Sequence, residues 1–523
     1  ISRPGTSEGG LFWIDDDTLT FASSGGTYKV DLPGKPGASS SPARLSSSSG
    51  SFVRRFAGGK AAWLVRGTPG TITTSGKTES YSFTARQALT QAGRMRTGFG
   101  AAWRLMKDNW YDPSFNNRDW TAVRDKYLPI AEAAADARQL GEVVSMMLGE
   151  LNGSHLGFYP SGVSSYRPSQ SWSESVGHLG VRFVDGADGP GWLVRDVLEG
   201  GPAADSDVDL QPGDRILAVD GIEVGPNVGP TAVLTGISAR DVELTILDAE
   251  SDEAEDKADE NGEADEEEEE GDEATEGGED EEPKSRTVIL RPISYGYARS
   301  LLYQHWLEHN RQTVDELSGG KLGYLHIRSM NGSSLLEYER QLYNVGYGRE
   351  GLIIDVRDNG GGSTADRLLT SLTQPIHAIT VPRGGSAGYP QDRKVYASWS
   401  KPIVVLCNQN SFSNAEIFSH AIKTLRRGKV VGVRTAGGVI STGSATVTDV
   451  GRIRQPFRGW YVAATGEDME LNGAVPHVEL WPQPGELPAG KDRQLEKAVT
   501  VLKKQVKKAK KSPPPALLKA TDR

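Results

Sequence analysis

One apolar run that ends in a polar turn and continues as a helical pattern limits most strongly what this chain can fold into. Residues 403–406 (Ile-Val-Val-Leu) have the length of a buried strand, and residues 415–425 repeat apolar side chains at helical spacing. Ser413 lies between them, at the start of the expected helix. A helix N-terminus offers free backbone N–H groups and a partial positive charge. A serine in this position could act as an acyl-transfer nucleophile, because the oxyanion formed on attack needs such donors. A helix cap with no chemistry is the alternative.

A second junction of the same kind lies upstream. The apolar stretch 351–356 is followed by the turn Gly360-Gly361-Gly362 and by a helical pattern over residues 365–372. Glycines allow a close approach of backbone to a ligand and adopt positive φ without penalty. The amide of Gly361, or of Gly360, is therefore a candidate oxyanion donor beside that of Asn414. The turn is not a Walker phosphate loop, because no Gly-Lys-Ser/Thr follows it.

Together the turns at 355–362 and 413–416 resemble the S41 family of serine peptidases, which includes the tail-specific proteases and the tricorn protease. Tail-specific proteases use a serine–lysine dyad, with the lysine at the end of a Thr-Phe-Gly-Lys-like turn. The matching turn here, residues 435–438, reads Thr-Ala-Gly-Gly, so Gly438 stands at the lysine position. The proton acceptor must come from elsewhere, or the domain is inactive.

A histidine can supply this acceptor. Residues 146–157 resemble the tricorn segment that carries a catalytic Ser-His pair, here Ser154 and His155. An imidazole with a pKa of about 6.5 can take the serine proton near neutral pH and return it to the leaving amine. The resemblance implies that Ser154 orients the ring and that Glu470, in a late Glu-x-x-Gly-like segment, is the carboxylate. Glu467 and Asp468 are rival candidates for that role.

Three segments, at 177–183, 201–204 and 210–221, resemble in their order the motifs of a PDZ domain. The resemblance implies that Leu179, Gly180 and Val181 form a loop that binds the terminal carboxylate of a peptide. Strand-like stretches at 242–247 and 287–292 flank a strongly acidic run, which is expected to replace a hairpin turn. Residues 250–282 hold 21 acidic residues and one lysine, against a formal net charge of −11 for the whole chain. Such a composition is typical of disorder.

We therefore expect a multidomain α/β and β protein, whose α/β peptidase domain has the ββα-type (crotonase-like) core that the resemblance implies. The expected domains are partial β-propeller blades (1–80), a helical domain that carries His155 (81–170), a PDZ domain (171–295) with an acidic disordered insertion (249–285), an S41 peptidase domain (296–502) and a basic disordered tail (503–523).

The expected function is a tricorn-type serine endopeptidase or oligopeptidase that acts on unfolded polypeptides or oligopeptides. A catalytically inactive PDZ scaffold that binds peptides is the alternative, and an esterase is a weaker one. No metal or cofactor site is expected, because Cys407 is the only cysteine and the histidines lack metal-ligand spacing. The resemblance implies a homo-oligomer in the cytoplasm. A periplasmic or exported location stays open, because the chain starts at Ile1 and is read as truncated. Neither nucleic-acid binding nor a membrane span is expected.

Overall fold

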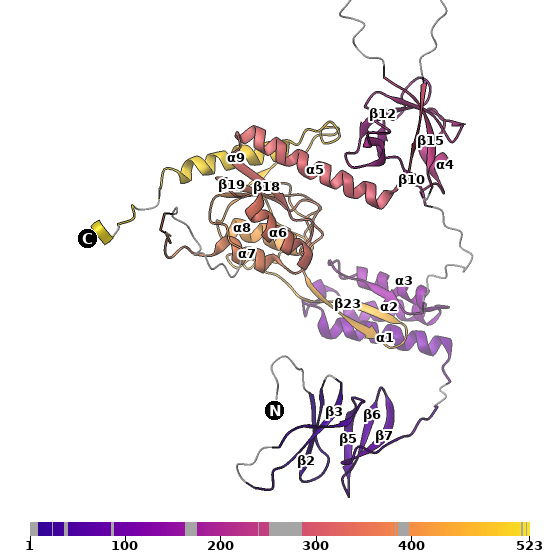
Figure 1. The fold of residues 1–523 in the computed structure, drawn as a ribbon. Coiled ribbons are helices and arrows are strands. Elements are labelled where there is room, and N and C mark those ends of the chain that lie inside the picture. Colours follow the sequence, from indigo (N-terminus) through magenta and orange to yellow (C-terminus); the bar gives the residue numbers. More distant parts are fainter. Residues whose placement is uncertain are drawn as a thin grey trace, which may run out of the picture. The chain divides into compact units, whose positions relative to one another are not determined.

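The computed structural model describes residues 9–23, 25–35, 40–84, 88–162, 175–238, 240–249, 285–381, 383–384, 397–513, 516–518 and 520–522. Its contacts divide the chain into two compact units, Ile1–Thr90 and Gln91–Arg523. Figure 1 labels the main elements of both.

The first unit holds two four-stranded antiparallel sheets, each connected as a simple meander. Buried Ile14, Trp63 and Ile72 form its core, and the rings of Phe12 and Phe52 stack at 4.9 Å. One or two such sheets cannot close a propeller, so the assignment of propeller blades stays a prediction. The strands are β1 (Gly9–Trp13), β2 (Thr18–Ser23), β3 (Gly26–Asp31), β4 (Ala43–Ser46), β5 (Ser51–Phe56), β6 (Lys60–Val65), β7 (Thr68–Thr73) and β8 (Thr78–Ser80).

The second unit begins with helices α1 (Gln91–Asn109), α2 (Trp120–Glu132) and α3 (Ala137–Gly149). Helix α2 ends at Glu132, and α3 is a separate helix that begins at Ala137. The Asp136 side chain accepts the amide of Gln139 and caps α3, which therefore begins a new helix there.

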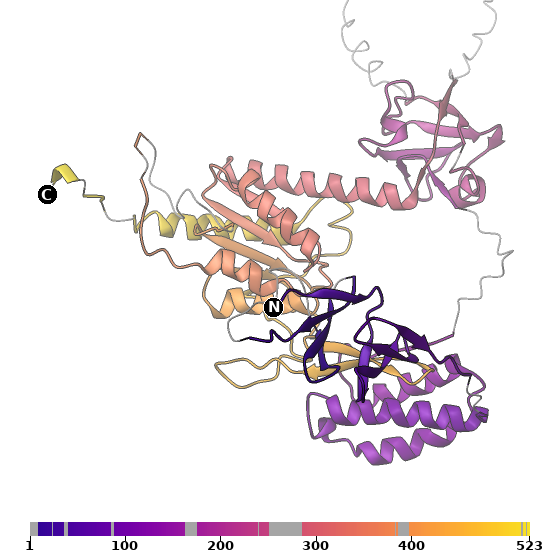
Figure 2. The ribbon, with the colours of Figure 1, turned by 60° about the horizontal axis from the view of Figure 1, so that its bottom comes forward.

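A hairpin from the far end of the sequence completes this helical domain. Strands β22 (Ser441–Val447) and β23 (Gly451–Arg458) pair with β9 (Phe158–Pro160), and in both views the hairpin lies along the helices (Figures 1 and 2). Val450 and Ile453 are fully buried in the same apolar cluster as the helices. The expected helical domain, residues 81–170, therefore holds only part of its own core, because Val450 and Ile453 of the peptidase segment belong to the same cluster.

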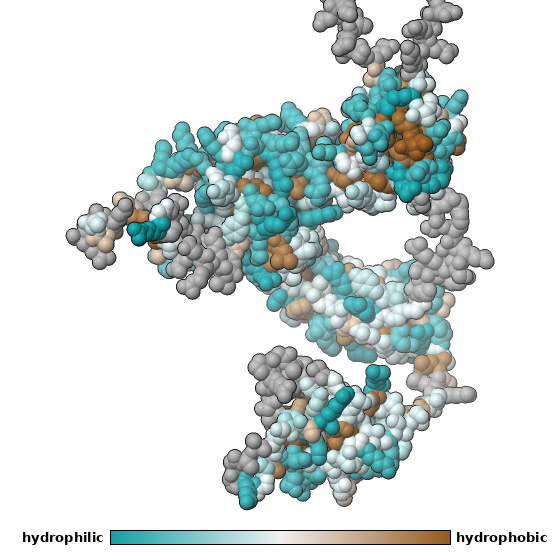
Figure 3. Space-filling model, in the orientation of Figure 1, coloured by the Kyte–Doolittle hydropathy of each residue, from teal (hydrophilic) through white to brown (hydrophobic). Residues whose placement is uncertain are grey.

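The PDZ region is built around a sheet in the order β11-β12-β13-β15-β16. Its β15 and β16 pair antiparallel from Val242↔Leu290 to Leu247↔Ser285, as expected for a hairpin whose turn is replaced by an insertion. The acidic run lies outside the described residues. In the space-filling view, apolar colour gathers on one face of this region (Figure 3). The elements are β10 (Gly177–His178), β11 (Val181–Phe183), β12 (Trp192–Val197), β13 (Arg215–Val219), β14 (Ile222–Glu223), α4 (Pro230–Leu234), β15 (Val242–Leu247), β16 (Ser285–Leu290) and β17 (Ile293–Ser294).

The peptidase region is a three-layer α/β/α sandwich around a parallel sheet in the order β18-β19-β20-β21-β24. Strands β19 and β20 are buried along their whole length, because α6, α7 and α8 pack in one apolar cluster and α5 and α9 in the other. The elements are α5 (Tyr295–Ser318), β18 (Leu322–His326), α6 (Gly332–Asn344), β19 (Gly351–Asp355), α7 (Ala365–Thr373), β20 (Ile403–Cys407), α8 (Asn414–Thr424), β21 (Lys429–Gly432), β24 (Val478–Glu479) and α9 (Arg493–Ala509).

The last helix corrects the expected start of the basic tail. α9 continues to Ala509, and its Leu502 and Val506 are buried in the cluster on the sheet. Residues 503–509 are therefore helical instead of disordered. In the described parts of the chain, no helix is long and apolar enough to cross a membrane.

Candidate active site

Ser413 lies where the sequence predicted it, between the end of β20 and the first residue of α8. Its backbone has φ 57° and ψ −118°, a strained conformation for a residue with a side chain. A strained serine in a sharp strand-to-helix turn is the arrangement that presents a nucleophile at the top of a sheet. The carboxyl ends of parallel strands, where β19 and β20 end in their turns, are also where open α/β sheets bind ligands.

The hydroxyl of Ser413 meets the predicted base. Its Oγ lies 3.1 Å from Nε2 of His155, and His155 Nδ1 lies 2.7 Å from Oγ of Ser154. Ser154 Oγ donates to Oε2 of Glu470 at 3.1 Å, and its amide donates to Oε1 at 2.6 Å. The four residues thus form one continuous chain of hydrogen bonds.

This chain determines which imidazole nitrogen carries the proton. Glu470 accepts the single hydroxyl proton of Ser154, so the Oγ of Ser154 is free to accept from Nδ1–H of His155. The lone pair of Nε2 then faces Ser413. Burial, and to a smaller extent the nearby Arg454, lowers the pKa of His155 to about 4. The ring is therefore neutral near pH 7, as a proton acceptor must be.

The two rival carboxylates lie outside this chain. Glu467 is exposed and accepts from Thr465, whereas Asp468 accepts from the Tyr111 hydroxyl and from the amide of Glu470. Asp468 therefore supports the loop that carries Glu470 and does not contact the imidazole chain itself.

The expected oxyanion donors need one correction. The amide of Gly361 donates to Oδ1 of Asn359 at 2.9 Å, and Gly360 is exposed away from the cavity beside Ser413. Gly362 and Asn414 line that cavity, and neither amide has a hydrogen-bond partner among the described residues. The available donor of the glycine turn is thus Gly362. Gly361 has a different role, since a Cβ there would lie 2.6 Å from that of Ser413.

Glu416 is a residue whose role the sequence did not reveal. Its carboxylate is fully buried and accepts four hydrogen bonds, from the amides of Ser413, Gly437 and Gly438 and from the Thr435 hydroxyl. Burial raises its pKa above the usual range despite these donors. The carboxylate joins the nucleophile turn to the 435–438 turn. In the sequence, the only sign of this role was that Glu416 stands three residues after Ser413, the spacing of a capping box at a helix start.

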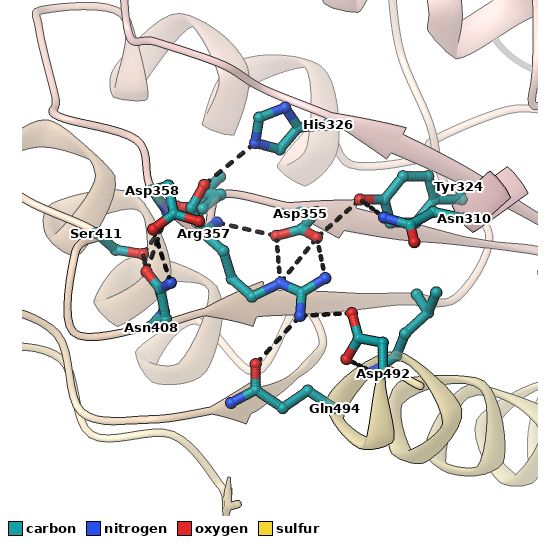
Figure 4. A network of polar contacts seen from close by, with 12 residues as sticks. Asn310, Tyr324, His326, Asp355, Arg357, Asp358, Asn408, Ser411, Asp492 and Gln494 are labelled. Atoms are coloured by element: carbon teal, nitrogen blue, oxygen red, sulfur yellow. Dashed lines mark hydrogen bonds and ion pairs between the residues drawn. The ribbon is translucent and has the colours of Figure 1, made fainter. Parts of the chain in front are cut away.

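A buried ion-pair network supports both active-site turns (Figure 4). Arg357 binds Asp355 at 2.7 Å and Asp492, at the start of α9, at 2.8 Å. The neighbouring Asp358 accepts from the side chain of Asn408 at 3.1 Å, in the turn that precedes Ser413. The glycine turn, the serine turn and α9 are therefore tied to one charged cluster at the end of the sheet.

Residue 438, at the position of the lysine in tail-specific proteases, has no room for a side chain here. A Cβ on Gly438 would lie 2.1 Å from Cε2 of Phe412. The ring of Phe412 stacks on the imidazole of His155, with 4.8 Å between centroids and 25° between planes. The space of the absent lysine is thus occupied by an aromatic ring.

A cavity of about 550 Å³ opens beside Ser413 and His155. Its wall includes the exposed aromatic side chains of Phe457 and Tyr461, and Asp366 supplies a carboxylate. An extended peptide could lie in it with one carbonyl near Ser413. In the described regions, no group of three or more His, Cys, Asp or Glu side chains is placed to hold a metal ion.

The residues expected to bind a peptide carboxylate lie at one end of the PDZ sheet. Leu179 is buried in the PDZ core, Gly180 has φ +87°, and Val181 begins β11. A cavity of about 390 Å³ lies between β11 and the start of α4. One of the expected donors is occupied, since the Gly180 amide donates to Nδ1 of His178 at 3.0 Å.

Comparisons with known proteins agree with this architecture. The family model described as Peptidase family S41 matches residues 321–480, the Tricorn protease C1 domain matches 95–149, and the PDZ domain matches 170–246. The C1 match covers most of α1 and all of α2 and α3, the helices that precede His155.

Relatives extend the likeness along most of the chain. Tricorn protease homolog 1 of Streptomyces coelicolor is 31% identical over 442 residues, which are 83% of this chain and 37% of that protein. The tricorn protease homolog of Saccharolobus solfataricus is 26% identical over 413 residues, 77% of this chain and 34% of that protein. A crystal structure of the tricorn protease has a TM-score of 0.60 at 20% identity, covering 95% of this chain and 46% of its own. The chain thus spans about a third of the length of these relatives.

The parallel sheet, the serine turn and the S41 match define a serine-type peptidase domain. With the C1 helices and the PDZ domain beside it, the chain carries a tricorn-like S41 peptidase domain.

Proposed function

We propose that the chain is a serine endopeptidase or oligopeptidase that hydrolyses peptide bonds in unfolded polypeptides or oligopeptides. The observation that carries this proposal is the contact of 3.1 Å between Ser413 Oγ and Nε2 of a half-buried His155. Ser413 attacks the peptide carbonyl while His155 takes its proton, and His155 then protonates the leaving amine. Water, activated in the same way, releases the acyl group.

The remaining residues stabilise charge as it develops. Ser154 and Glu470 orient the imidazole and stabilise its protonated form. The amides of Gly362 and Asn414 bind the oxyanion, where the loss of one donor typically costs about 10²–10³ in turnover. Gly362 replaces Gly361 in this proposal, because the Gly361 amide is bonded to Asn359.

The proposal extends to binding. The PDZ groove at Leu179, Gly180 and Val181 docks the carboxyl end of a peptide substrate, and the protein assembles as a homo-oligomer. The two meanders of the first unit are blades of a β-propeller. The docking role is tested by comparing the cleavage of one peptide with a free carboxyl end and with an amidated end. Light scattering measures the mass of the protein in solution and so tests the assembly.

The competing function is an inactive peptide-binding scaffold. It gained support from the missing lysine, but the complete chain from Ser413 to Glu470 removes the need for one. The relatives named as proteases also favour the enzyme.

Cleavage of a fluorogenic peptide library separates the two functions. We expect turnover by the unaltered chain and its loss in Ser413→Ala and in His155→Ala. Matched controls are Ser300→Ala and His305→Ala, both on the exposed side of α5, which should leave turnover unchanged. Full activity in either active-site variant would overturn the mechanism, and peptide binding without any cleavage would favour the scaffold.

A further inference from the structure

The ring of Phe412 fills the space between the imidazole of His155 and the backbone of Gly438. It stacks on His155 on one side, and on the other it occupies the volume that a side chain at residue 438 would need. Both contacts lie within the site, and both are packing contacts of the Phe412 ring.

Hydrogen bonds hold both the turn at Gly438 and the backbone that carries the Phe412 ring. The amide of Gly438 donates to the buried carboxylate of Glu416 at 2.8 Å, which holds the turn in place. The amide of Phe412 donates to the carbonyl of Asn359 at 2.9 Å, and Phe412 directly precedes the nucleophile. The backbone that carries the ring and the turn beside the ring are therefore both held in place, with the imidazole on the opposite side of the ring.

The hydrogen bonds of His155 leave one motion free. Both ring nitrogens bond within the plane of the imidazole, to Ser154 and to Ser413, so they do not stop the ring from tilting out of that plane. A flat ring packed on one face does stop this motion.

We propose that Phe412 is a positioning residue that holds His155 in line with Ser413, and that Gly438 is required because it leaves room for this ring. The inference rests on the proposed peptidase mechanism. It also explains the pairing of a histidine base with glycine at residue 438, since a lysine side chain and the Phe412 ring would need the same space.

The ring also covers one face of the imidazole from water. The charged groups near His155 are Arg454 on β23 and Glu470, which is reached through Ser154, while Asp366 lines the same cavity. Uncovering the face favours the protonated imidazole, whose pKa then rises from about 4 toward its ordinary value.

The test combines Phe412→Leu, Gly438→Ala and the double variant. We expect Phe412→Leu to lower kcat about 10²-fold, the usual cost of a misplaced catalytic group, with little change in KM. In Phe412→Leu, the acidic limb of the pH–activity profile should move to higher pH, because the pKa of His155 rises. Gly438→Ala should lower kcat similarly by displacing the ring. The double variant should lose no more than Phe412→Leu alone, because both changes act on the same contact and their losses should not add. Gly332→Ala, whose Cβ meets nothing within 4 Å, is the matched control.

Two results would overturn the inference while the peptidase mechanism stands. One is Phe412→Leu with unchanged kcat and pH profile, and the other is Gly438→Ala with full activity. If the unaltered chain cleaves nothing, the proposed function fails instead. NMR titration of His155 still tests the stack in that case, and an equal pKa in the unaltered chain and in Phe412→Leu would refute it.

Discussion

Nε2 of His155 lies 3.1 Å from Oγ of Ser413, although the two residues are 258 positions apart in the chain. Hairpin β22–β23 makes this possible, because it leaves the peptidase region and completes the core of α1–α3. The Tyr111 hydroxyl adds a second link by donating to Asp468 at 2.8 Å. The positions of His155 and Ser413 relative to each other therefore depend on one shared core.

Ile453→Ala tests this dependence. Ile453 is fully buried in the shared core, so we expect a loss of about 2–5 kcal/mol in the free energy of unfolding. Activity should fall in conditions where the protein is still folded, because the hairpin shifts against the loop of His155. Denaturant unfolding and kcat/KM measure the two effects. Ile289→Ala, at a position 65% exposed, is the control. Normal activity in folded Ile453→Ala would contradict the coupling.

Glu470→Gln should lower kcat by about 10²–10⁴, the range expected when a general base loses its support. The carboxylate accepts hydrogen bonds from Ser154 and from the amide of Val439. An amide NH₂ group in its place would face a donor and disturb the order of protons along the chain of hydrogen bonds. Peptide turnover measures the effect. Glu467→Gln removes an equal charge at an exposed position nearby and should change little. Equal losses in both variants would mean that charge alone matters.

The pH profile reports on the base. Since burial and then Arg454 lower the pKa of His155 to about 4, kcat/KM should stay high at mildly acidic pH and fall only as the pH approaches that value. Arg454→Gln removes a cation that disfavours the protonated ring, so the acidic limb should move to higher pH. Arg452→Gln, on the same strand but exposed, is the control. An acidic limb at the same pH in Arg454→Gln and in the unaltered chain would show that the guanidinium does not affect the pKa of His155.

Arg357→Gln should destabilise the protein by about 3–5 kcal/mol, because it leaves the fully buried Asp355 without its cation. Arg340→Gln breaks the exposed pair with Glu337 and should cost about 0–1 kcal/mol. Denaturant unfolding measures both changes. Similar values for the two variants would indicate that water reaches the Asp355 site.

Local patterns were sufficient for the serine turn. The apolar run before Ser413 and the helical spacing after it determine a strand, a turn and a helix through nearby residues alone. The PDZ hairpin was predictable for the same reason, since its two strands alternate regardless of what separates them. His155, Ser154 and Glu470 came from the resemblance of their segments, because no local rule joins residues so far apart.

Other features depended on the tertiary structure. Whether Gly361 or Gly362 offers its amide depends on the direction of single peptide planes, which a run of glycines leaves open. The four donors around Glu416 come from two separate turns, and the ring of Phe412, stacked on His155, fills the space beside Gly438 in one of them. The sequence determined the chemical groups and the elements that carry them. Only packing between distant segments decided which groups face one another, because side-chain contacts follow from the shared core and not from position in the chain.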